Sequence, residues 1–260
     1  MSSELKIKKI IHLIWFDDFS TCHHNVEENV KVWRNLNDDF HVMLWDYEDT
    51  DLFIKNKYPD YYERWLNIPE VDCQFPKIKK HDCARYFILN YFGGCYFDID
   101  IYPIRPIKSL LNDKKIYGHK LNRFDKLRET DFAFNIRESN LINKDIILVK
   151  EALNMDHLGK SVANGWIMSN SDLPIWLNLA EYCFYNQNEN VLNSFGTHAF
   201  AKFIRANISY FKEASAILPC YYGLWKESIY GPIDQFPFVF SYHAGDLSWG
   251  NHNLEKPWTA

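Results

Sequence analysis

Residues 78–107, IKKHDCARYFILNYFGGCYFDIDIYPIRPI, combine a helix pattern with a strand pattern, and the rest of the chain can be placed around them. The first half predicts a helix that ends at a glycine pair. Its apolar positions recur at the spacing of one helical face: Ala84, Phe87, Ile88 and Tyr91. Residues 95–101 form a short apolar and aromatic run, which is typical of a buried strand. Pro103 and Pro106 are expected to end regular pairing soon afterwards.

Two acidic residues, Asp98 and Asp100, lie at the end of this predicted strand. Because side chains alternate along a strand, both carboxylates are expected on the same side. They repel each other unless a cation lies between them, and oxygen ligands suit a hard ion such as Mg²⁺ or Mn²⁺ that also binds substrate phosphates. Ligands of open α/β sheets bind beyond the carboxyl ends of the strands. The pair indicates a metal-diphosphate site, although a solvated strand end has the same pattern.

The predicted helix carries a second pair of charges near its start. Asp82 and Arg85 are three residues apart, so they share one helix face. A local ion pair explains this spacing. The alternative is that both residues bind a sugar or a phosphate held by the metal.

The whole block from Asp82 to Asp100, D-x-x-R-Y-x-x-L-x-x-x-G-G-x-Y-x-D-x-D, resembles the sugar-binding DXD signature of glycosyltransferases of the family 32 type. That group includes yeast α-mannosyltransferases and bacterial capsule enzymes, with the glucosylating clostridial toxins as distant relatives. The resemblance implies a GT-A fold of the α/β class, in which helices flank a mixed, mainly parallel, Rossmann-like sheet. We expect one domain over residues 1–260, with a nucleotide-binding part at about 7–107 and a part that closes over donor and acceptor at about 108–260.

The resemblance also assigns roles to individual residues. The catalytic group would comprise Asp82, Arg85, Asp98 and Asp100. The metal would be bound by Asp98, Asp100 and His243, with Asp246 or Asn251 as substitutes for the histidine. An imidazole ligand favours Mn²⁺ over Mg²⁺. The donor nucleotide sugar would be bound by Trp15, Tyr96, Asn164, Ser248 and Trp249.

Plainer interpretations of several of these residues remain open. Trp15 follows a β-rich run at 7–16 and is either a core residue or the ring that stacks on the nucleobase. Asn164 precedes Gly165 and marks either a tight turn or a contact to the donor sugar. The polar cluster from His243 to His252 is either a solvated tail or a loop of the site.

The flanking segments predict further helices and strands. Strands at 7–16 and 40–45, joined by a helix at 25–36, form a βαβ unit and therefore predict a parallel sheet. Further elements are expected as a helix at about 52–66, a strand at 131–136, a helix that begins at Pro174 and a helix at 198–206. His198 is interpreted as a helix-start residue.

Composition excludes several classes of protein. The net charge of −5 argues against a nucleic-acid partner. The six cysteines form no C-x-x-C pair, which argues against a zinc site and a disulfide scaffold and favours a reducing compartment. No stretch is long and apolar enough to cross a bilayer, and no signal peptide is recognisable. Relatives in the eukaryotic secretory pathway carry a membrane anchor, so we expect a cytoplasmic protein of the bacterial or large-virus type.

The expected function is that of a metal-dependent, retaining glycosyltransferase. It would move a hexose or N-acetylhexosamine from a nucleotide diphosphate sugar, with UDP favoured over GDP by resemblance, to a glycan or protein hydroxyl. One alternative is a binding protein that has the fold without catalysis. A weaker alternative is a phosphatase of the haloacid-dehalogenase type, because the apolar run that ends in Asp98-Ile99-Asp100 resembles the D-x-D strand of that class. The class has Thr or Val two positions after the second Asp, and this chain has Tyr102 there.

Overall fold

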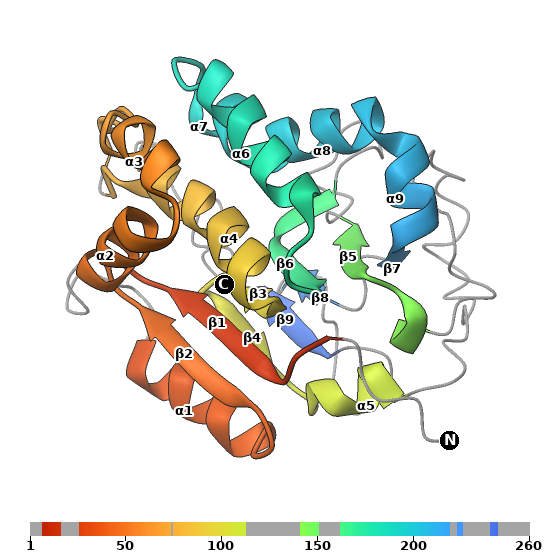
Figure 1. Ribbon diagram of the computed structural model, residues 1–260. Coiled ribbons are helices and arrows are strands. Elements are labelled where there is room, and N and C mark those ends of the chain that lie inside the picture. The colour runs from red at the N-terminus through yellow and green to blue at the C-terminus, as the bar shows by residue number, and fades with distance from the viewer. Residues whose placement is uncertain are drawn as a thin grey trace, which may run out of the picture.

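The computed structural model describes residues 7–16, 26–73, 75–112, 141–150, 162–218, 223–225 and 240–243. Figure 1 shows their elements, with helices packed around a central sheet. The strands are β1 Ile10–Ile14, β2 His41–Trp45, β3 Gly94–Phe97, β4 Ile101–Pro103, β5 Ile146–Lys150, β6 Val162–Ser169, β7 Ser215–Leu218, β8 Gly223–Trp225 and β9 Ser241–His243. The helices are α1 Val26–Leu36, α2 Tyr47–Lys57, α3 Pro59–Leu66, α4 Ile78–Phe92, α5 Ile107–Asn112, α6 Pro174–Tyr185, α7 Val191–Ser194, α8 Thr197–Ala206 and α9 Ile208–Ala214, with a 3-10 turn at Leu141–Asn143.

The main sheet has six strands in the order β2-β1-β3-β6-β5-β7. Strand β1 is parallel to β2 and β3, and β5 is parallel to β7, while β6 runs antiparallel to both of its neighbours. Strands β4, β9 and β8 form a second, three-stranded sheet. The predicted α/β class, with a mixed and mostly parallel sheet flanked by helices, is confirmed.

Both faces of the main sheet are buried, because successive strand residues enter different cores. In β5, Ile146 and Leu148 join the core under α4, α6 and α8, whereas Ile147 and Val149 join the core under α1 and α5. A strand covered on both faces has to be apolar along its buried length, as β5 is from Ile146 to Val149.

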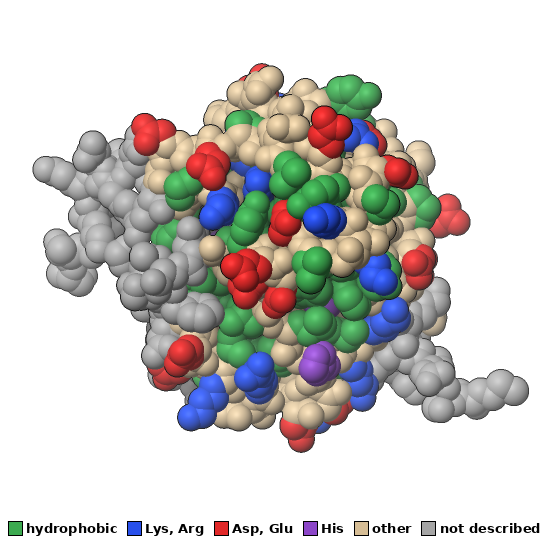
Figure 2. Space-filling view, turned by 60° about the vertical axis from the view of Figure 1, so that its left-hand side comes forward, with side chains coloured by type: hydrophobic (Ala, Val, Ile, Leu, Met, Phe, Trp, Pro, Cys, Tyr) green, Lys and Arg blue, Asp and Glu red, His purple; other side chains and the backbone are tan. Residues whose placement is uncertain are grey.

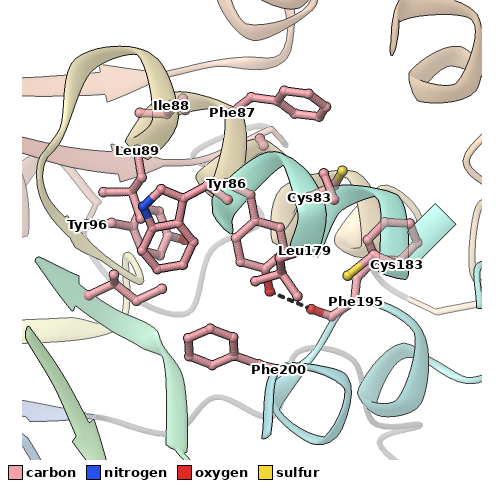
Figure 3. Packing of buried hydrophobic residues seen from close by; sticks show 14 of the residues in the cluster. Cys83, Tyr86, Phe87, Ile88, Leu89, Tyr96, Leu179, Cys183, Phe195 and Phe200 are labelled. Atoms are coloured by element: carbon pink, nitrogen blue, oxygen red, sulfur yellow. Dashed lines mark hydrogen bonds between the residues drawn. The ribbon is translucent and has the colours of Figure 1, made fainter. Parts of the chain in front are cut away.

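Helix α4 lies at the centre of the molecule and is buried on all sides from residue 79 to residue 90. Figure 3 shows its aromatic side chains packed with residues of α6 and α8. The hydroxyl of Tyr86 donates a hydrogen bond to the carbonyl of Phe195 over 3.0 Å. The sequence predicted only one apolar face here, and Tyr91, which was assigned to it, is exposed.

Two glycines join α4 to β3, as the sequence predicted. Gly93 and Gly94 have φ values of 64° and 91°, which favour glycine. A Cβ on Gly94 would lie 2.6 Å from the carbonyl oxygen of Ile10, so this glycine allows β3 to pack beside β1. The pair thus brings the end of α4 and the start of β3 against the centre of the sheet.

Three other predictions require correction. The single helix expected at 52–66 is two helices, α2 and α3, because Pro59 starts a new helix after Tyr58. Pro103 does not end the pairing but lies in β4, an edge strand where its missing N–H costs no ladder hydrogen bond. The strand expected at 131–136 lies outside the described residues.

The other predicted elements agree with the structure to within a few residues. Cys83, Cys95 and Cys183 are free and buried, as expected of core cysteines. Within the described part of the chain no helix is long and apolar enough to cross a membrane. On the face shown in Figure 2, lysine and arginine side chains are interspersed with acidic and apolar ones.

Candidate active site

The acidic pair lies at the carboxyl end of β3, where the chain passes from the large sheet to the small one. The strand prediction for this pair was wrong in detail, because β3 ends at Phe97 and Asp98 begins a turn. The turn is closed by a hydrogen bond from the Ile101 amide to the Asp98 carbonyl over 2.9 Å. Asp98 and Asp100 are therefore brought together by a turn and not by strand alternation.

Side chains of helix α1 donate hydrogen bonds to the backbone of this turn. The side-chain amide of Asn29 donates to the carbonyls of Ile99 and Ile101, over 2.6 and 3.0 Å. The indole of Trp33 donates to the Ile101 carbonyl over 3.1 Å. These three hydrogen bonds from one helix hold the backbone of the turn in a defined shape.

His243 reaches the acidic pair through the second sheet. Strand β9 pairs with β4 so that His243 lies opposite Ile101. Nε2 of His243 is 3.0 Å from a carboxylate oxygen of Asp100. The ligand atoms of Asp98, Asp100 and His243 all lie within 4.8 Å of one another. Two carboxylates and one imidazole form a donor set that fits Mn²⁺ and, less well, Mg²⁺.

Arg85 connects Asp82 of α4 to Asp98 of the turn. Its guanidinium is paired with Asp82, lies 3.2 Å from Asp98 and donates to the Asn164 carbonyl over 2.6 Å. It also lies over the ring of Tyr96, 4.7 Å from the ring centre. The Tyr96 hydroxyl donates to Asp98 over 2.6 Å. Four predicted site residues and the Asn164 backbone thus form one network around a guanidinium that is only 2% exposed.

Burial governs the electrostatics of this network. It raises the pKa of Asp82 to about 6, because desolvation outweighs the nearby positive charge of Arg85. For Arg85 the balance is reversed: burial opposes its charge, but the carboxylates of Asp98 and Asp82 raise its pKa. Arg85 therefore stays charged while Asp82 can exchange a proton near neutral pH.

Strand β6 supplies the next residues of the site, so the tight turn considered for Asn164 and Gly165 does not exist. The Asn164 side chain donates to Asp82 over 3.3 Å and accepts from the Thr197 hydroxyl over 3.1 Å. A Cβ on Gly165 would lie 2.1 Å from a carboxylate oxygen of Asp98. Gly165 is therefore needed for the position of Asp98. The sequence alone does not show this requirement, because a glycine after Asn164 also has the pattern of a turn.

Trp15 follows β1 and is 7% exposed, beside Phe75 and His81. Its indole nitrogen has no hydrogen-bond partner among the described residues, and neither has Nε2 of His81. His81 is not among the predicted site residues, and the only feature of the sequence that marks it is its position directly before Asp82. Ser248 and Trp249, and the substitute ligands Asp246 and Asn251, lie outside the described residues. His198 lies in the first turn of α8 and is exposed, as expected of a helix-start residue.

Residues 23–117 match a family described as "Glycosyltransferase sugar-binding region containing DXD motif". The match contains Asp82, Arg85, Tyr96 and both acids of the turn, while His243 lies outside it. The resemblance predicted from the sequence is confirmed, and the predicted enzyme class, glycosyltransferase, is that of the matched family.

Two curated relatives illustrate the extent of the similarity. The mannosyl phosphorylinositol ceramide synthase CSH1 of Saccharomyces cerevisiae is 36% identical over 77 residues, which cover 30% of this chain and 19% of that protein. An uncharacterized glycosyltransferase, L373, of Acanthamoeba polyphaga mimivirus is 24% identical over 197 residues, which cover 75% of this chain and 63% of the viral one. The chain thus aligns with less than two thirds of either relative.

Among solved structures, the PaToxG glycosyltransferase superposes with a TM-score of 0.46 and 17% sequence identity. The superposition covers 78% of this chain and 70% of that one.

Proposed function

We propose, from the match of residues 23–117 to a glycosyltransferase sugar-binding region, that this chain is a metal-dependent glycosyltransferase. It would transfer a hexose or N-acetylhexosamine from a nucleotide diphosphate sugar to a hydroxyl of a glycan or protein. The observation that carries the proposal is the meeting of Asp98, Asp100 and His243 at the end of β3, beside the buried Arg85. Nucleotide binding is assigned to about 7–107 and donor closure to about 108–260.

The diphosphate of the donor would lie beside the acidic turn, at the ligand atoms of Asp98, Asp100 and His243, with Arg85 behind Asp98. Asp98, Asp100 and His243 would hold a divalent ion, which would supply positive charge near the departing diphosphate. Arg85 adds a fixed cation within 3.2 Å of Asp98, and its buried network keeps it in place before the donor arrives. Tyr96 orients Asp98 through its hydroxyl. The same turn would therefore bind the donor and stabilise its leaving group.

The donor sugar would contact Asp82 and Asn164. Asp82 accepts hydrogen bonds when ionised, and Asn164 is oriented by the hydroxyl of Thr197. The Asn164 amide is thus preorganised to contact sugar hydroxyls beside Asp82. Trp15 would stack on the nucleobase at the end of β1. From the resemblance, Ser248 and Trp249 would contact the diphosphate of the donor.

The finer features of the reaction are also proposals. We infer a UDP-sugar as donor and retention of the anomeric configuration from the resemblance to toxin and capsule enzymes. Attack on the same face as the leaving group, assisted by the departing phosphate, suits a site in which Arg85 and the metal ligands gather on the diphosphate. The name of the yeast relative specifies a mannosyl group, so mannose donors belong in any test panel.

The test is a donor-turnover assay with UDP- and GDP-sugars, with and without Mn²⁺, on the wild type and on Asp98→Ala. We expect release of one nucleotide that depends on Mn²⁺ and is lost in the variant. Nucleotide binding without turnover would instead favour a binding protein, and hydrolysis of phosphate monoesters a phosphatase.

A further inference from the structure

His81 occupies a boundary position in the molecule. It lies in the first turn of α4, next to Asp82, and is 8% exposed. Its ring centre is 4.6 Å from that of Phe16 and 6.1 Å from that of Trp15, both of which follow β1. The imidazole thus lies between the end of β1 and the start of α4, at the edge of the charged network.

The hydrogen bonding of His81 is incomplete. Within the described ranges Nε2 has no partner, and the same holds for the indole nitrogen of Trp15. Leaving a polar group buried and unpaired is destabilising, so native proteins rarely keep one without a use. Here two such nitrogens belong to rings that contact each other.

The charged groups that face His81 come from two sides. Arg85 lies on its own helix, and Asp100 lies on the turn after β3. Burial, helped by the charge of Arg85, lowers the pKa of His81 to about 3, although Asp100 acts in the opposite direction. The ring is therefore neutral at physiological pH, with one nitrogen that donates and one that accepts. It is not part of the group formed by Asp98, Asp100 and His243.

We propose that His81 is a further residue of the donor site and that its Nε2 hydrogen-bonds the nucleoside part of the donor. This inference rests on the proposed function and extends it. In the proposed site, Trp15 lies at the nucleoside end and Arg85 at the diphosphate end. His81 contacts the ring of Trp15, and the charge of Arg85 acts on its imidazole. A neutral imidazole suits a ribose hydroxyl or a base edge, whereas the doubly charged diphosphate is served by Arg85 and the metal ligands.

The experiment is calorimetric titration of UDP, GDP and inorganic pyrophosphate, each with Mn²⁺. The proteins are the wild type, His81→Phe, which keeps an aromatic ring without nitrogens, and His81→Gln, which keeps a polar end. The matched control is His41→Phe, since His41 is exposed at the start of β2. We expect His81→Phe to weaken nucleotide binding about 10-fold, to leave pyrophosphate binding within about twofold, and to be partly rescued by His81→Gln.

Each outcome is decisive. Where the wild type binds both UDP and GDP, an equal loss places the contact on the ribose and an unequal loss places it on the base. Unchanged nucleotide affinity in His81→Phe, or an equal loss of pyrophosphate affinity, overturns the role of His81 while the proposed function stands. A wild type that binds no nucleotide overturns both. If His81→Phe does not fold, His81→Ala is titrated in its place against the same expectations.

Discussion

Strand β1 touches two pairs of buried histidine and tryptophan, and the pairs differ in one respect. At the middle of the strand, His12 accepts a hydrogen bond from the indole of Trp45 over 3.1 Å, and its other nitrogen lies 2.9 Å from the Gly93 carbonyl. At the end of the strand, Trp15 and His81 are in ring contact, yet within the described residues neither Nε1 nor Nε2 has a partner.

The difference distinguishes a buried pair that only stabilises the fold from a buried pair that is available to bind a ligand. Both histidines are buried and both have a lowered pKa, about 4 for His12 and about 3 for His81, so neither property identifies a site. What distinguishes them is whether the fold itself satisfies their nitrogens. We call His12 and Trp45 the closed pair, and Trp15 and His81 the open pair. The closed pair should stabilise the fold without taking part in binding, and the open pair should contribute to ligand binding at a cost in stability.

The largest expected effect comes from breaking the closed pair. His12→Ala leaves the Trp45 indole unsatisfied and opens a cavity, so we expect a loss of about 3 kcal/mol in the free energy of unfolding. Chemical denaturation measures it, with the exposed His41→Ala as the control. The affinity of the folded fraction for nucleotide and Mn²⁺ should not change, and a large loss of affinity would contradict the division between the pairs.

The next effect concerns the acidic turn after β3, which belongs to the charged part of the proposed site. Gly165→Ala places a Cβ 2.1 Å from the Asp98 carboxylate, so the acid must leave its position. We expect turnover of the donor to fall about 100-fold, because misplacing a group of the site costs roughly that much. The matched control is Ala163→Ser on the same strand. Normal turnover by Gly165→Ala would mean that the position of Asp98 is not critical.

The smallest effect is a pH dependence carried by Asp82. Its pKa is raised to about 6, so this residue's contribution to stability is complete below pH 3.8, the ordinary pKa, and is lost as the pH rises through 6. Activity should run in the opposite direction and fall about 10-fold per pH unit below pH 6, if the ionised carboxylate accepts the sugar hydroxyl.

Denaturation midpoints of the wild type and Asp82→Asn between pH 5 and pH 7 test the stability part. The difference should shift in favour of the variant as the pH rises. A constant difference would show that the Asp82 pKa is not raised.

The sequence predicted most of the fold because local patterns determined most elements. The helical spacing of α4, the glycine pair after it and the start of β3 agree with the structure, although β3 ends at Phe97 and Tyr91 is exposed. Predictions failed where tertiary contacts decided the outcome. Hydrogen bonds from α1 made a turn of the acidic pair, and pairing with β3 and β5 made a strand of Asn164 and Gly165.

For the site, the sequence indicated which residues take part but not which atoms of other elements they contact. It placed Asp98, Asp100 and His243 in one set, and the structure brings them within 4.8 Å although 143 positions separate the last two. It could not identify Gly165 or His81, since the requirement on each is set by atoms from another element. A clash with Asp98 and an unsatisfied nitrogen are visible only in three dimensions.

The most direct test of the account is a calorimetric titration of UDP and GDP, with and without Mn²⁺, on the wild type and on Asp100→Ala. The exposed Asp60→Ala on α3 serves as the control. We predict that the wild type and the control bind one nucleotide only with Mn²⁺, and that Asp100→Ala loses this binding. Nucleotide binding that needs no metal, or that survives in Asp100→Ala, would contradict the assignment of the metal site to the turn after β3.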